Sequence, residues 1–180
     1  LATIEESLDR LTRLVEKLLD MSRLQAGALA TSPQAMSMAE TLATALDEIG
    51  APGRDIAVHV PFDLPEVYAD PALVERILVN TVRNAVRYSP DGEPPMIAVS
   101  EHGGAIETRI VDRGPGIPSS QWDTVFLPFQ RLGDRDNATG VGLGLALSRG
   151  LAEAMAGTLT PDTTPGGGLT MTLRLPRADA

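Results

Sequence analysis

The hydrophobic positions of the first 26 residues predict one long amphipathic helix. Apolar side chains recur at alternating steps of four and three residues, which places them on one heptad seam. The seam comprises Ile4, Leu8, Leu11, Val15 and Leu18, is continued in phase by Ser22 and Gln25, and is widened by Leu1, Leu14 and Met21. Its partner is either the core of the same domain or a second helix of a dimeric bundle. The length and regularity of the seam favour the bundle.

After residue 31 the pattern changes to short elements of both kinds. Ser37 followed by Glu40 forms a capping box, and Asp70-Pro71 is a typical helix start. Alternating apolar residues indicate strands between the helices. The expected elements are a helix at 38–49, a turn at 50–53, a half-buried strand at 56–60 with His59 on the surface, a strand at 67–69 and a helix at 71–88.

The second half of the chain reads as two hairpins, a lid and a helix. The expected elements are strands at 97–99 and 106–111 around a turn at 102–104, a helix at 141–156, and strands at 157–160 and 169–175 around a turn at 165–168. Residues 114–139 lack periodicity, and a loop of this length is usually functional. We expect its apolar residues to anchor it to the core: Trp122, Val125, Phe126, Leu127 and Phe129. The order of elements predicts an α+β fold, a mixed sheet with helices on one face.

Composition narrows the function classes. The 180 residues carry a net charge of −9, which disfavours binding to nucleic acid. The chain has no cysteine and two histidines, so we expect neither disulfides nor a zinc site. We see no signal peptide and no apolar run of transmembrane length. Because the chain begins within a helical pattern, we expect a soluble piece cut from a membrane-bound parent.

Two asparagines in the middle of the helix at 71–88 need an explanation, because asparagine is a mediocre helix former. Asn80 and Asn84 lie one turn apart on the same face, near Arg87 and Tyr88. One reading is a buried amide that caps a loop. The other is a magnesium site, since Mg²⁺ takes oxygen ligands and shares them with phosphates. Arg87 could then hold a phosphate oxygen through its permanent charge.

Two further segments suggest a nucleotide. Asp112 ends a strand before a Gly-Pro-Gly turn, and its carboxylate would suit an exocyclic amino group such as that of adenine. The stretch Thr139–Leu145 reads T-G-V-G-L-G-L before a helix, where glycine backbone and free N–H groups can receive phosphate. Taken singly, each segment is also compatible with an ordinary turn or with tight packing.

Taken together, the motifs resemble those of a known family. The order N-x-x-x-N-A-x-x-Y, D-x-G-x-G-I, F-x-P-F and T-G-x-G-L-G-L is similar to the N, G1, F and G2 boxes of sensor histidine kinases. These belong to the ATPase superfamily shared with DNA gyrase and the Hsp90 chaperones. The glycine-rich forms look closest to potassium/turgor-sensing kinases. The resemblance implies a two-layer α/β sandwich of the Bergerat type over 33–177, preceded by the second helix of the dimerisation hairpin over 1–28.

The resemblance also implies roles for individual residues. Asn84 would be the main Mg²⁺ ligand, with Asn80 assisting. Asp112 would bind the adenine amino group, residues 114–139 would form the ATP lid, and Arg131 would contact phosphate. The full nucleotide-binding set would be Asn80, Asn84, Arg87, Tyr88, Asp112, Gly114, Gly116, Ile117, Arg131, Thr139, Gly140, Val141, Gly142, Leu143, Gly144 and Leu145.

The implied function is to bind Mg·ATP and to donate its γ-phosphate to a histidine on the dimerisation hairpin, for transfer to the receiver domain of a response regulator. The implied setting is the cytoplasmic part of a membrane-anchored, homodimeric bacterial sensor, with no membrane or nucleic-acid contact by this piece. Neither His59 nor His102 has the H-E/D-x-x-x-P context of the acceptor, so we expect no autophosphorylation by the chain alone.

The chain departs from the family pattern at Arg83, which precedes Asn84 where acidic residues are common, so we expect a changed local charge with the nucleotide site kept. Two alternatives stay open. One is an ATP hydrolase or serine kinase of the same superfamily, although Asn80 occupies the area where gyrase-like members place a carboxylate base. The other is an interaction module that has lost nucleotide binding.

Overall fold

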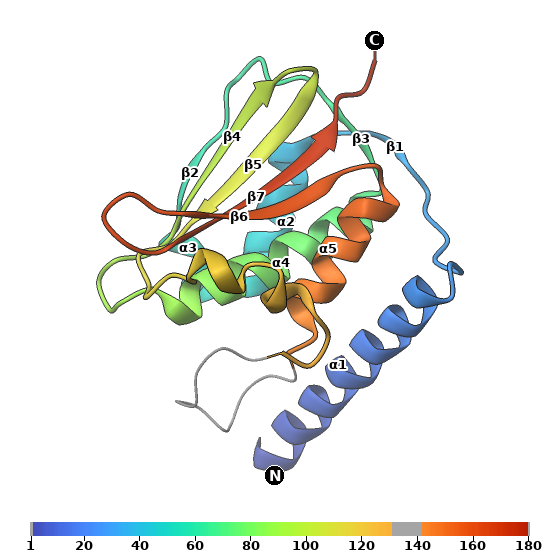
Figure 1. Ribbon diagram of the computed structural model, residues 1–180, viewed down its shortest axis with the longest axis vertical. Helices are drawn as coiled ribbons and strands as arrows, with labels where there is room; N and C mark the ends of the chain where they lie inside the picture. Colours follow the sequence, from blue (N-terminus) through green and yellow to red (C-terminus); the bar gives the residue numbers. More distant parts are fainter. Residues whose placement is uncertain (1, 131–141, 180) are drawn as a thin grey trace.

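A five-stranded mixed sheet forms one layer of the domain (Figure 1). The computed structural model describes residues 2–130 and 142–179, without the side chains of residues 2–7, 9, 10, 13 and 54. The strand order is β2 (Ala57–His59), β4 (Met96–His102), β5 (Ala105–Val111), β7 (Leu169–Pro176) and β6 (Thr158–Thr163). Strands β2 and β4 are parallel and all other neighbours are antiparallel. The expected mixed sheet is therefore confirmed.

Helices form the second layer, on one face of this sheet (Figure 1). They are α2 (Met38–Ile49), α4 (Pro71–Tyr88) and α5 (Gly144–Ala154). Alternate residues of the strands β4, β6 and β7 are buried against them, so that Leu173 is fully buried while its neighbour Thr172 is half-buried. The core between the layers consists of aliphatic side chains such as Leu42, Ile77 and Leu151. The α+β class predicted from the pattern is confirmed.

The predicted helix starts at Ser37 and Asp70 are confirmed, with the serine half of the capping box present. Ser37 Oγ accepts a hydrogen bond from the Glu40 N–H at 3.3 Å. Asp70 Oδ1 accepts from the N–H groups of Ala72 and Leu73 at 3.0 and 3.3 Å. Because these bonds satisfy N–H groups that have no partner within the helix, they fix where α2 and α4 begin.

Several local expectations are wrong. A short strand β1 (Gln34–Met36), for which no element was predicted, pairs antiparallel with β3 (Val67–Ala69). The turn at 50–53 is instead a short helix, α3 (Ala51–Arg54). Helix α5 begins at Gly144 and not at 141, since glycine with positive φ at position 142 precedes it. Val58 on edge strand β2 is 39% exposed, because no strand covers that edge.

The segment after β5 folds back on the core through two short 3-10 turns, η1 (Ser119–Gln121) and η2 (Thr124–Phe126). Val125 and Phe126 are buried, as expected of anchors. Leu127 and Phe129 are 52% and 63% exposed, so the same expectation is wrong for them.

Helix α1 (Ala2–Gln25) lies outside the two layers, beside α5 (Figure 1). Its seam residues are exposed, with values of 57% for Leu8, 58% for Leu11, 46% for Val15 and 39% for Leu18. The reading in which these four side chains pack on the domain's own core is therefore wrong. In the described part of the chain, no helix combines the length and the apolar character needed to cross a membrane.

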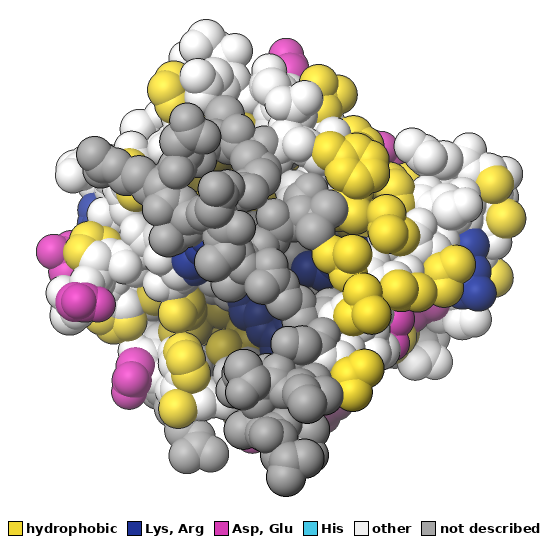
Figure 2. All heavy atoms as spheres, turned by 90° about the horizontal axis from the view of Figure 1, so that it is seen from below, with side chains coloured by type: hydrophobic (Ala, Val, Ile, Leu, Met, Phe, Trp, Pro, Cys, Tyr) yellow, Lys and Arg dark blue, Asp and Glu magenta, His cyan; other side chains and the backbone are white. Residues whose placement is uncertain are grey.

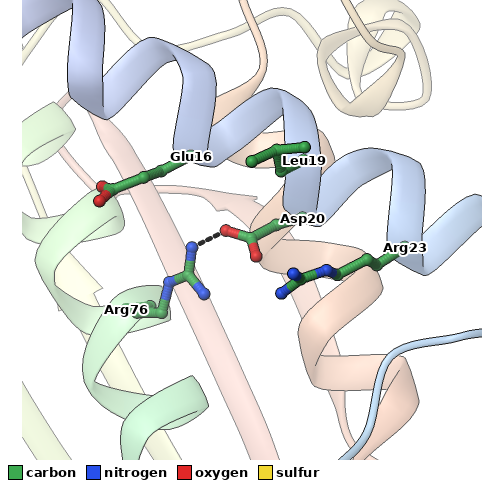
Figure 3. Close-up of a pocket in the computed structure, with 5 residues that line it drawn as sticks. All are labelled: Glu16, Leu19, Asp20, Arg23 and Arg76. Carbon is green, nitrogen blue, oxygen red and sulfur yellow. Dashed lines mark ion pairs between the residues drawn. The ribbon is translucent and has the colours of Figure 1, made fainter.

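A different side of α1 holds it to the domain. Met21 is buried with Leu143 and Ala146, and Leu24 fills the space above Gly150 on α5. Figure 3 shows the Asp20 carboxylate of α1 pointing toward the Arg76 guanidinium of α4, with which it forms an ion pair. Met21, which was expected to widen the seam, therefore faces the domain, whereas Leu8, Leu11, Val15 and Leu18 stay exposed.

Candidate functional site

Asp112 lies at the end of β5 with its carboxylate held in one orientation. The residue is only 5% exposed. Its Oδ1 accepts hydrogen bonds from the backbone N–H groups of Gly114 and Leu169, both at 2.9 Å. Its Oδ2 accepts none from the described residues. A buried carboxylate with one occupied and one available oxygen can receive a further donor, such as an amino group.

Three glycines bring backbone segments close around this carboxylate. A Cβ on Gly114 would lie 2.5 Å from the carbonyl oxygen of Tyr88, at the end of α4. A Cβ on Gly116, where φ is +68°, would lie 2.9 Å from the carbonyl oxygen of Gly168. Gly168 itself has φ of +112° and packs its Cα against the Asp112 carbonyl. Side chains at these positions would push the walls of the site apart.

Sequence reasoning missed Gly168 and Leu169 as parts of this site. The P-G-G-G signal at 165–168 predicted only a hairpin turn. Leu169 forms two hydrogen bonds with Asp112: its carbonyl accepts from the Asp112 N–H at 2.9 Å, and its own N–H donates to the Asp112 carboxylate at 2.9 Å. The pairing of β7 with β5, which was not predicted, brings these residues together.

The two asparagines of α4 have different environments. Asn80 Nδ2 donates a hydrogen bond to Ser148 Oγ at 2.9 Å, and its amide lies against Gly144 at the start of α5. Asn84 is half-buried and forms no hydrogen bond with the described residues. Asn80 therefore joins α4 to α5, while the amide of Asn84 keeps its hydrogen-bonding capacity.

Arg87 and Tyr88 close α4 at its exposed end. The Arg87 guanidinium lies 5.5 Å from the centroid of the Tyr88 ring, and Tyr88 is 51% exposed. Ile117, on the other side of Asp112, is half-buried against the core, and its carbonyl accepts a hydrogen bond from Trp122 Nε1 at 3.0 Å.

Helix α5 begins without a side-chain cap. Leu143 occupies the N-cap position, is 2% exposed, and makes no capping bond through its side chain. Gly142 has φ of +72°, and its carbonyl accepts a hydrogen bond from the Phe129 N–H at 2.9 Å. This bond joins Phe129 to the residues that lead into α5. Leu145 is half-buried on the first turn. The expected site residues Arg131, Thr139, Gly140 and Val141 lie outside the described residues.

Figure 2 views the domain from the end where α1 begins. Lys and Arg side chains gather in the middle of this face, with hydrophobic side chains around them. In a chain of net charge −9, such a basic area is a local exception that suits an anionic ligand. Among the described residues, no group of three His, Cys, Asp or Glu side chains could hold a metal ion by itself. A cation here would need amide oxygens and ligands from a bound molecule.

The Asp112 carboxylate, the glycine turns around it and the end of the asparagine-bearing helix α4 lie together in the structure. The family model for histidine kinase-, DNA gyrase B- and HSP90-like ATPases matches residues 69–179. The chain therefore belongs to this family, and the two-layer fold expected for it is confirmed.

Relatives narrow the class to sensor histidine kinases. The sensor protein KdpD of Rathayibacter rathayi is 47% identical over 170 residues, which cover 94% of this chain and 20% of that protein. KdpD of Mycobacterium tuberculosis is 44% identical over 185 residues, which cover 97% of this chain and 21% of the relative. The chain thus spans about a fifth of the length of these relatives.

Solved structures agree with this class. Full-length ShkA, crystallised in complex with AMPPNP, superposes with a TM-score of 0.85 at 27% identity, over 99% of this chain and 38% of that one. The Acinetobacter baumannii histidine kinase AdeS superposes with a TM-score of 0.80 over 99% of this chain and 84% of its own length, but at 22% identity it supports the fold alone. The chain is thus an ATPase domain of this family and is similar over nearly its whole length to part of the KdpD sensor proteins and of ShkA.

Proposed function

We propose that the domain binds Mg·ATP with the adenine amino group at Asp112 and the phosphates at the start of α5. The observation that carries the proposal is the Asp112 carboxylate, whose Oδ1 is held by two backbone N–H groups while Oδ2 has no partner among the described residues. A carboxylate that is already held in one orientation loses little conformational entropy when the base binds. Gly114 and Gly116 would let a flat base lie against the backbone.

The metal and phosphate roles rest on α4 and α5. Asn84 would be the protein ligand of Mg²⁺, because its amide has no partner among the described residues, and Asn80 would assist through its oxygen. The uncapped N–H groups of Leu143, Gly144 and Leu145 would donate to phosphate oxygens. Arg87 and Tyr88 would contact phosphate and nucleotide. When bound, Mg²⁺ would neutralise part of the negative charge of the phosphate oxygens.

Arg131, Thr139, Gly140, Val141 and Gly142 complete the proposed phosphate site. We infer these roles from the family motifs, because all but Gly142 lie outside the described residues. Gly142 has the positive φ that such a motif requires.

At the level of the whole protein, we propose that ATP bound here phosphorylates a histidine on the other helix of the dimerisation hairpin. The exposed seam of α1 supports its role as one helix of that hairpin, with residues 1–28 and 33–177 as the two units of the chain. The proposed partners are a second protomer and the receiver domain of a response regulator, and the proposed setting is the cytoplasmic side of a membrane-anchored sensor.

Titration of the chain with AMPPNP, in the presence and absence of Mg²⁺, tests the nucleotide site. We expect saturable binding that Mg²⁺ strengthens. A separate helix carrying the acceptor histidine, added with labelled ATP, then tests the kinase role by transfer of label to that helix. Absence of nucleotide binding at millimolar ligand would leave only an interaction module.

The same assay distinguishes a hydrolase of the superfamily. Hydrolysis needs a carboxylate base near the start of the site, but Asn80 stands there and donates its amide to Ser148. We therefore expect release of inorganic phosphate to stay at the background rate. Release of phosphate without labelling of the histidine would favour the hydrolase over the histidine kinase.

A further inference from the structure

The turn between β6 and β7 forms one wall of the Asp112 site, and the Arg113 side chain attaches the turn to the end of β5. Arg113 Nη1 donates a hydrogen bond to the carbonyl oxygen of Pro165 at 2.6 Å. Arg113 directly follows Asp112, and Pro165 lies in the turn that leads to Leu169. The bond therefore joins the end of β5 to the β6–β7 turn. The contact between these two segments orients the Asp112 carboxylate.

The remaining contacts of this turn come mostly from its backbone. Gly168 packs against the Asp112 carbonyl, and its own carbonyl accepts a hydrogen bond from the Thr164 N–H at 3.2 Å. The hydroxyls of Thr164 and Thr170 lie 2.9 Å apart and link the two strands at the base of the turn. Two side chains at the end of β5 hold this segment: Arg113 at Pro165 within the turn, and Asp112 at Leu169 where the turn ends.

We propose that Arg113 is a positioning residue that sets the preference of the site for a 6-aminopurine over a 6-oxopurine. The proposal rests on the proposed nucleotide function. Arg113 holds the turn, the turn places the Leu169 N–H, and this N–H keeps Asp112 Oδ1 in place so that Oδ2 faces the base edge. A carboxylate oxygen accepts from an amino group and repels a carbonyl oxygen, so selectivity depends on how firmly the carboxylate is held.

Arg113 is exposed, and its pair is a hydrogen bond from a charged donor to a carbonyl. Removing the side chain should therefore loosen the turn without unfolding the domain. We expect R113M to lower the ratio of ADP to IDP affinity by about 3- to 10-fold, the range for losing one partly solvated charge-assisted hydrogen bond. R113K keeps a charged donor on a shorter side chain and should restore part of the ratio of ADP to IDP affinity.

The test measures ADP and IDP affinities of the chain by calorimetry in the presence of Mg²⁺, together with a thermal melt of each variant. R177M is the matched control, because Arg177 is an exposed arginine that pairs with Glu101 at 2.8 Å, away from Asp112. R177M should leave the ratio unchanged. If R113M does not fold, R113K carries the same comparison.

Loss of ADP affinity with little change in IDP affinity supports the proposal. Equal loss for both nucleotides, or no loss for either, overturns it, because a merely structural contact does not discriminate at C6 of the base. If the unmodified chain binds neither nucleotide, the proposed function fails first, and the titration of that chain alone reveals it.

Discussion

The adenine end and the phosphate end of the proposed site differ in how their polar groups are satisfied. At the adenine end, Asp112 Oδ1 already accepts two backbone N–H groups, and glycine turns pack against each other around it. At the phosphate end, Asn84 has no hydrogen bond with the described residues, and α5 starts without a side-chain cap. One end is preorganised by the fold, and the other leaves donors and acceptors for a ligand.

This difference follows from the chemistry of the two parts of a nucleotide. A neutral base is recognised by a few directed hydrogen bonds, so the protein acceptor must be fixed in advance. Phosphates and a cation bring strong charge, so they can order backbone N–H groups and amides as they bind. Disturbing the adenine end should therefore affect stability and base choice, whereas disturbing the phosphate end should affect Mg²⁺-dependent affinity.

The largest effect is expected for Gly168→Ala. A Cβ at this position would collide with the Asp112 carbonyl, and φ of +112° is strained for alanine. We expect the free energy of unfolding to fall by about 3–4 kcal/mol, from strain and displaced backbone together. Urea unfolding measures this value.

Gly167→Ala is the matched control, because Gly167 has φ of +108° but a Cβ added there would meet no atom within 4 Å. It should cost only the strain, about 1–2 kcal/mol. If both variants lost the same stability, the close approach at Gly168 would not contribute to the adenine end.

Asp112→Asn tests base recognition with the shape of the side chain preserved. The asparagine oxygen can still accept hydrogen bonds from the N–H groups of Gly114 and Leu169. However, an NH₂ group replaces Oδ2, so two hydrogen-bond donors would face each other when the amino group of adenine binds. We expect ADP affinity to fall by about 30- to 100-fold, equivalent to about 2–3 kcal/mol, and IDP to become the better ligand. Calorimetry with both nucleotides measures the change, and unaltered ADP affinity would contradict the role of Asp112.

The sequence predicted those parts of the fold and site that depend on neighbours in the chain. Ser37 and Asp70 cap helices through bonds to residues two or three positions away, and the glycine motifs are contiguous. The Asp112–Leu169 bond joins residues 57 positions apart, and the Asn80–Ser148 bond joins residues 68 apart. Such contacts arise from strand order and helix packing, which periodicity alone does not encode.

The same reason explains the missed strand β1, which has only one buried residue, Met36, and is defined by its pairing with β3. It also explains the exposure of Leu127 and Phe129. Their apolar character indicated burial, but the chain turns at Phe129, where φ is +63°, and leaves both side chains outside the core.

Asn84→Ala and Asn80→Ala compare the main proposed metal ligand with the assisting residue that also joins α4 to α5. Asn84→Ala should weaken ADP binding by about 10-fold with Mg²⁺ present, because one oxygen ligand of the cation is lost, and should leave stability and Mg²⁺-free binding unchanged. Asn80→Ala should lower the free energy of unfolding by about 1 kcal/mol, since buried Ser148 loses its partner. Titrations in Mg²⁺ and in EDTA, with urea unfolding, measure both. Equal weakening of binding by Asn84→Ala in the two buffers would exclude it as a metal ligand.

The smallest effect is expected from α1, which touches the phosphate end but not the adenine end. Met21 is buried against Leu143, the N-cap residue of α5, and Ala146. Met21→Ala removes the α1 side chain from this small cluster, so the first turn of α5 should become less ordered. We expect ADP affinity to fall by about 2- to 3-fold, while adenosine, which has no phosphate, binds as before.

Leu19→Ala provides the control for this last variant, because Leu19 lies on the same helix and is 53% exposed. It should change neither affinity, since its side chain is largely exposed and is not a member of the cluster of Met21, Leu143 and Ala146. A fall of adenosine and ADP affinity in equal proportion for Met21→Ala would mean that the two ends are coupled through the core. A fall for ADP alone would mean that α1 acts on nucleotide binding through the phosphate end, so that whatever moves α1 also changes the affinity for ATP.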